Sequence, residues 1–104
     1  MKFYIKHSMT GRLRVHMDMK HMSFKQADIL EYYIKNIETV TSVKVYEKTC
    51  DAVIEFKGDK AQIINELKHF TYSQVVVPED VLNSSGREMN SFYQDKLVNK
   101  VFLR

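Results

Sequence analysis

The 104-residue chain contains one cysteine, one proline, three glycines and no tryptophan. A single cysteine cannot form an internal disulfide, which fits a reducing compartment. So few glycines and prolines leave little room for long irregular loops. No apolar run approaches the roughly 20 residues that span a bilayer, and the N-terminus has no apolar core of signal-peptide length. These absences predict that the chain as given is a soluble, cytosolic domain.

The composition is that of an ordinary globular protein. Apolar residues make up 44% of the chain, enough for one hydrophobic core at this length. The net charge of +3 comes from 16 basic and 13 acidic residues that are mixed along the sequence. A nucleic-acid-binding domain usually concentrates its basic residues on one face, so the small excess by itself indicates no such partner.

Two stretches near the N-terminus alternate between apolar and polar residues, as strands do. In residues 2–7, Phe3 and Ile5 lie on one side, and in residues 12–18 every second residue is again apolar. The pattern predicts that residues 12–18 form the first core strand. Residues 2–7 are either its extension across a bulge at Gly11 or a short edge strand.

A helix is predicted over residues 24–37. Ser23 and Gln26 have the spacing of a capping box, in which each side chain caps a backbone N–H at the start of a helix. Apolar residues then recur at steps of three and four, which places them on one helix face: Ala27, Leu30, Ile34 and Ile37.

The rest of the core reads as a hairpin, a second helix and a last strand. In order, we expect strands over 43–46 and 52–57 joined by a turn at 48–51, a helix over 60–70 with Asp59 as its N-cap, and a strand over 73–77 that Pro78 stops. The order βαββαβ predicts an α+β, ferredoxin-like fold: a four-stranded antiparallel sheet with two helices on one face, plus an N-terminal strand extension and a C-terminal helix.

The predicted domain covers residues 1–79. Residues 80–104 read as a linker followed by an amphipathic helix, because Met89, Tyr93, Leu97 and Val101 recur every four residues. The sequence stops while its apolar content is rising and without a helix-ending signal. We therefore expect more protein beyond Arg104, with this segment leading towards a membrane region.

The sharpest local pattern is His7-Ser8-x-x-Gly11-Arg12-x-Arg14 ahead of the capped helix. With it, the chain resembles the heavy-metal-associated-like domains at the N-termini of bacterial metal-transporting P-type ATPases, notably those of Gram-positive type. The resemblance extends over nearly the whole chain, and the other similar segments are 40–45, 86–90 and 93–97.

This resemblance implies a regulatory, docking or metal-sensing domain on the cytoplasmic face of the cell membrane, attached to a transporter of a transition metal such as iron. Its partner would be the remainder of that transporter, with no membrane insertion by this segment and with self-association left open. One departure matters: the chain has no Cys-x-x-Cys, which excludes a two-thiolate Cu(I) or Zn(II) site. The phosphorylation motif of the ATPase is also missing, so no ATP hydrolysis by that route is expected.

A methionine- and histidine-rich stretch lies where related domains carry their cysteines. The candidate metal ligands are His16, Met19, His21 and Met22. Thioethers with imidazoles suit Cu(I), and imidazoles with the carboxylate of Asp18 suit Fe(II) or Zn(II). The alternative is that the stretch is structural, partly core and partly surface loop, because methionine is a common filler of irregular core space.

Arg12 and Arg14 point to the same side of their predicted strand. Two guanidinium groups at this spacing form a fork for a phosphate, a carboxylate or an acidic partner, which makes them candidate docking and anion-binding residues. The alternative is a solvated face whose arginines pair with nearby carboxylates. Cys50 falls in the predicted turn and reads as an ordinary exposed or half-buried thiol.

Other functions of this fold find less support. RNA-recognition domains need adjacent aromatics on the central strands, and residues 52–57 offer only Phe56. Acylphosphatase-like enzymes need a glycine-rich phosphate loop, which is missing around Gly11. We therefore predict no catalytic centre and no nucleic-acid partner. The competing hypothesis is a stand-alone interaction or ligand-sensing module that dimerises, and the two differ in whether apolar segments follow Arg104.

Overall fold

The computed structural model describes residues 1–75 and residue 77. The described elements, in chain order, are β1 (Phe3–Met9), β2 (Arg12–Met17), α1 (Phe24–Lys35), β3 (Val40–Tyr46), β4 (Asp51–Phe56), α2 (Ala61–His69) and the 3₁₀ turn η1 (Tyr72–Gln74). The predicted linker and amphipathic helix of residues 80–104 lie outside the described residues.

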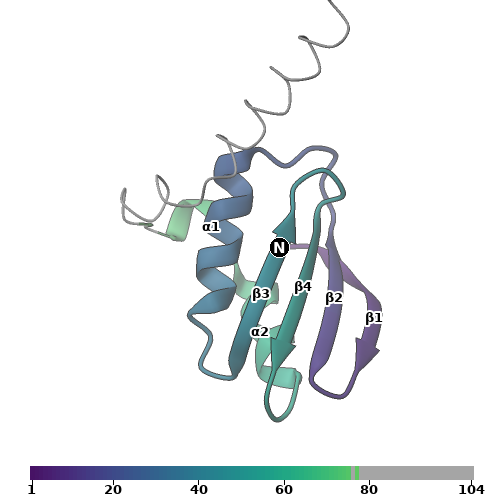
Figure 1. Ribbon diagram of the computed structural model, residues 1–104. Coiled ribbons are helices and arrows are strands. Elements are labelled where there is room, and N and C mark those ends of the chain that lie inside the picture. The colour runs from purple at the N-terminus through teal and green to yellow at the C-terminus, as the bar shows by residue number, and fades with distance from the viewer. Residues whose placement is uncertain (76, 78–104) are drawn as a thin grey trace, which may run out of the picture.

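The strands form one antiparallel sheet in the order β1-β2-β4-β3. Figure 1 shows α1 alongside the β3 edge and α2 behind the sheet, with β1 at the opposite edge. Apolar side chains from both helices join those from the sheet in one buried cluster, so both helices cover the same face. The predicted α+β, ferredoxin-like fold with a four-stranded antiparallel sheet and two helices is confirmed.

The fourth strand of the sheet is β1, and the predicted strand over 73–77 is wrong for residues 73–75. Those residues lie in or next to η1. β1 reaches the edge of β2 through the tight turn at Thr10-Gly11, where Gly11 adopts a positive φ of 76° that glycine accepts without strain. Such a short loop closes at little entropic cost. After α2, Phe70 is buried and Val75 packs against the core, and η1 contacts α1 instead of the sheet edge.

The helix starts follow local hydrogen bonding. The predicted capping box is present: the Gln26 N–H donates to Ser23 Oγ over 3.0 Å, and the Ser23 N–H donates to Gln26 Oε1 over 2.9 Å. α1 ends at Lys35, one half-turn before the predicted Ile37. The N-cap of α2 is Lys60, although the Asp59 carboxylate still accepts the Ala61 N–H over 3.0 Å.

The core lies between the sheet and the helix pair. It is built from alternate residues of β2 and β4 and from the helix faces that the apolar spacing predicts. Its fully covered members include Leu13, Val15, Met17, Ala27, Leu30, Ile34, Ile54, Ile63 and Leu67. The opposite side of the sheet, here called the open face, carries no helix of the described chain. None of the described helices is both long enough and apolar enough to cross a membrane.

Candidate functional site

The open face is built from the residues that alternate with the core positions of each strand. β1 places Lys6 and His7 beside β2, which contributes Arg12, Arg14 and His16. β4 contributes Asp51, Val53 and Glu55, because these pair with the outward residues of β2 across the sheet. The alternation of β2 alone thus explains why the predicted pair Arg12 and Arg14 share this side.

A buried carboxylate lies on this face at the start of β4, covered by the side chains of one lysine, one arginine and one histidine. The side chain of Asp51 has no exposed surface. Its Oδ2 accepts hydrogen bonds from Arg14 Nε (3.2 Å), from an Arg14 terminal nitrogen (2.9 Å) and from Lys6 Nζ (3.1 Å). Its Oδ1 accepts from His16 Nδ1 over 2.7 Å. Side chains from β1 and β2 therefore meet at this carboxylate of β4.

The charge of Asp51 is stabilised by these neighbours. Burial by itself raises the pKa of a carboxyl group, but the hydrogen bonds from His16, Arg14 and Lys6 outweigh it and lower the pKa of Asp51 from 3.8 to about 2. Asp51 is therefore ionised at neutral pH, where it holds the side chains of Lys6 and Arg14 against the sheet. The Tyr4 ring packs on His16 with centroids 4.9 Å apart, which fixes the imidazole as well.

Sequence reasoning missed Asp51 because it assigned residues 48–51 to the hairpin turn. The structure begins β4 at Asp51, directly after Cys50, whose φ of 59° completes the turn. Asp51 lies two residues before Val53 and four before Glu55, so all three side chains point to the same side of the strand. Had the predicted strand over 52–57 begun at residue 51, the alternation would have placed Asp51 on the open face. Its partners still lie 35 to 45 residues away in the sequence, and only the register of β2 on β4 brings them there.

The two predicted arginines have different roles. Arg14 is tied to Asp51, which matches the alternative of a structural ion pair. Arg12 makes no hydrogen bond or ion pair with any described residue, although Glu55 lies opposite it across the sheet. Both arginines line a shallow hollow of the open face together with Lys6, His7, Met9 and Val53. Arg12 and His7 are thus available to a negatively charged partner in this hollow.

The four candidate metal ligands do not share one surface. His16 lies on the open face and bonds Asp51, whereas Met22 is buried in the core on the helix side of the sheet. Met19 packs against the core and its sulfur accepts a hydrogen bond from the Tyr72 hydroxyl over 3.7 Å, and His21 is exposed. Within residues 1–75 and 77, no group of three or more His, Cys, Asp or Glu side chains is arranged to hold a metal ion.

The hypothesis that this stretch binds a metal ion has a direct test. Because the structure separates His16 from Met22, we expect neither the wild type nor a His16→Ala/His21→Ala variant to bind Cu(I) or Fe(II) at micromolar concentration. Competition titrations with a chromophoric chelator measure this under anaerobic, reducing conditions. Micromolar binding by the wild type that the double variant loses would contradict the expectation and establish the loop as a metal site.

Cys50 is more buried than the sequence suggested, with 4% of its surface exposed. Burial raises the pKa of its thiol, and the neighbouring Asp51 carboxylate raises it further. A thiol of raised pKa forms little of the thiolate that acts as nucleophile or metal ligand. Cys50 is therefore a core residue of the hairpin turn and contributes nothing to the open face.

Comparisons with known proteins add no assignment. No family model, no curated protein and no solved structure matches the chain. The fold and the open face are consequently the observations on which a functional proposal rests.

Proposed function

We propose that this chain is a non-catalytic docking domain, the cytosolic N-terminal regulatory module of a transition-metal P-type ATPase, iron being one candidate cargo. It binds an acidic surface of the rest of that transporter through the open face. The observation that carries the proposal is the hollow around Arg12 and His7, in which the Arg12 guanidinium faces solvent without a described partner. The absence of Cys-x-x-Cys supports docking over metal transfer.

The residues that carry the family resemblance support the same surface. His7, Arg12 and Arg14 of the His7-Ser8-x-x-Gly11-Arg12-x-Arg14 pattern all line the hollow. Gly11 makes the tight turn that brings β1 back beside β2, and a Cβ there would lie 3.3 Å from the Phe56 carbonyl oxygen. The pattern thus combines a turn with the histidine and arginine side chains that the turn positions.

The electrostatics of the open face favour an acidic partner. Lys6, Arg12, Arg14 and Lys44 contribute positive charge, and of the two carboxylates Asp51 and Glu55 the first is buried beneath its cations. Exposed cations on one face accelerate encounter with a negative surface and make the complex sensitive to salt. Asp51 holds Lys6 and Arg14 in place before a partner arrives, which lowers the entropic cost of binding.

The natural gene offers the first test. If its product continues past Arg104 into apolar segments long enough to span a membrane, the transporter proposal is supported. A product that ends at Arg104 would contradict it and favour the stand-alone interaction module instead.

The second test separates the two arginines. In binding measurements between this chain and the transporter lacking it, Arg12→Ala should weaken the complex roughly tenfold, a typical loss for an exposed interface arginine. The melting temperature should hardly change, because Arg12 has no described partner. Arg14→Ala should weaken binding too, but with a loss of stability of about 1 kcal/mol, since its exposed guanidinium is only one of three partners of Asp51.

Lys25→Ala provides the matched control. Lys25 is an exposed residue at the start of α1, on the helix side of the domain, and loses the same charge. The affinity of the Lys25→Ala variant for the rest of the transporter should equal that of the wild type. Equal affinity for the Arg12→Ala variant and the wild type, or no dependence of binding on salt concentration, would refute docking through the open face.

A further inference from the structure

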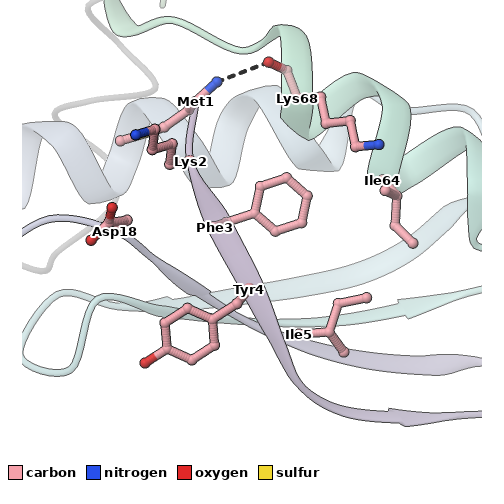
Figure 2. Close-up of a pocket in the computed structure, with 8 residues that line it drawn as sticks. All are labelled: Met1, Lys2, Phe3, Tyr4, Ile5, Asp18, Ile64 and Lys68. Carbon is pink, nitrogen blue, oxygen red and sulfur yellow. Dashed lines mark hydrogen bonds between the residues drawn. The ribbon is translucent and has the colours of Figure 1, made fainter.

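A second surface lies at the β1 edge of the sheet, apart from the open face. Figure 2 shows a groove between β1 and α2, with Phe3 and Ile5 pointing towards the helix and Ile64 and Lys68 extending from it. Lys2 stands beside the N-terminal end of β1, where the Met1 ammonium group donates to the Lys68 carbonyl oxygen over 2.8 Å. The floor of the groove is apolar and its rim carries lysines.

The groove exists because the apolar layer of the sheet extends beyond the cover that α2 provides. Ile5 pairs with Val15 across the sheet and points to the same side. Val15 has no exposed surface, whereas 41% of Ile5 is exposed. An apolar side chain on the core side of an edge strand, left open to water, marks a position where another strand would complete the layer.

The backbone of β1 is also available for pairing. Within the described part of the chain, β1 bonds only β2, so the other row of its N–H and C=O groups faces outwards. The bulge between Ile5 and His7 separates the segment that borders the groove, residues 3–5, from the rest of β1. The residues that directly follow α2 run towards α1 and do not cover this edge.

The charge around the groove selects among occupants. Lys2 and Lys68 stand at its rim, and Asp18 is the one carboxylate among its lining residues. The β1 strand of a second copy contains Lys6 and no carboxylate, so it would bring no opposite charge to these lysines, and like charges at close range oppose pairing. A strand with carboxylates would instead place opposite charges beside the lysines.

We propose that this groove binds an extended segment of a partner protein by strand addition to β1. Alternate side chains of that segment are aliphatic and pack on Phe3, Ile5 and Ile64, and carboxylates at its intervening and end positions lie within reach of Lys2 and Lys68. Main-chain hydrogen bonds to β1 supply affinity, and the alternation supplies specificity. This groove is a different surface from the open face, so the inference does not depend on the docking proposal.

The test uses the full 104-residue chain and a synthetic peptide as probe. The peptide is acetyl-Glu-Val-Thr-Val-Glu-Ile-Glu-amide, and the reference is the same peptide with lysine in place of each glutamate. In ¹⁵N NMR titrations we expect the acidic peptide to shift amides of β1 and of the Ile64–Lys68 turn of α2, with a dissociation constant below about 1 mM. The lysine peptide should bind at least tenfold more weakly.

Variants locate the site and its charge preference. Ile5→Lys should abolish binding, with Ile5→Thr as the milder replacement if the first fails to fold. Tyr46→Lys, at an exposed position of the opposite edge strand β3, should leave binding unchanged. A Lys2→Glu/Lys68→Glu double variant should prefer the lysine peptide. No shifts at millimolar peptide, shifts confined to the Arg12 and Arg14 surface, equal binding of both peptides, or a dimer in sedimentation that Ile5→Lys dissolves would each overturn the proposal.

Discussion

Replacing Asp51 with asparagine should destabilise the domain by about 2–3 kcal/mol, because the change leaves the charges of Lys6 and Arg14 beside a site without a carboxylate. This loss is smaller than the loss expected when a fully buried ion pair is broken. The side chains of Lys6 and Arg14 remain 41% and 44% exposed, so water can solvate much of their released charge. Chemical denaturation of both proteins measures the difference in the free energy of unfolding. The comparison requires that this free energy depends on denaturant concentration with the same slope in both proteins.

The same substitution has a defined pH dependence. The folded-state pKa of Asp51 is lowered to about 2 from an unfolded value of 3.8, so its ionisation contributes about 2 kcal/mol of stability. For a lowered carboxyl pKa, this contribution is complete above pH 4 and disappears as the pH falls through 2. The stability difference between the wild type and Asp51→Asn should therefore be constant between pH 5 and 6 and shrink below pH 4.

The exposed Glu55→Gln variant is the control for Asp51→Asn. It removes one carboxylate from the same strand and the same face, but that carboxylate has no described ion-pair partner. Its stability should lie within about 0.5 kcal/mol of the wild type at neutral pH. If Asp51→Asn were equally harmless, the ion cluster would not organise the open face.

Replacing Phe70 with alanine should have the largest effect on stability, a loss of about 3–5 kcal/mol, as for other large-to-small changes at buried aromatics. Phe70 is 1% exposed and follows the last residue of α2. Its ring lies 4.8 Å from the rings of both Tyr33 and Tyr72, so it joins α1, α2 and η1. Its loss would leave a cavity where the chain turns from α2 towards α1.

Tyr33→Phe is the matched variant for this cluster, because it keeps the ring and removes only the hydroxyl. That hydroxyl donates to Glu66 Oε2 over 2.8 Å and lies 3.1 Å from the Glu66 carbonyl oxygen. Burial and the Glu66 carboxylate raise the pKa of Tyr33 to about 12, so the hydroxyl keeps its proton at neutral pH. The expected cost is about 1 kcal/mol. Thermal unfolding of both variants should rank Phe70→Ala well below Tyr33→Phe.

Elements that depend on neighbouring residues could be predicted from the sequence. The capping box of Ser23 and Gln26 placed the start of α1, because both hydrogen bonds lie within one helical turn. The alternation of β2 placed Arg12 and Arg14 on one side, since successive side chains of a strand point to opposite faces. These signals fit within a few residues, so no knowledge of the fold was needed to interpret them.

Only the tertiary structure decided which segment closes the sheet and what surrounds Asp51. The β-branched run at 73–77 predicted a strand, but the hairpin turn at Gly11 delivers β1 to that edge at a smaller entropic cost. Asp51 was assigned to a turn, and Lys6, Arg14 and His16 were distant in sequence. A buried charge acquires its partners from the register of separate strands, and that register is a property of the folded sheet.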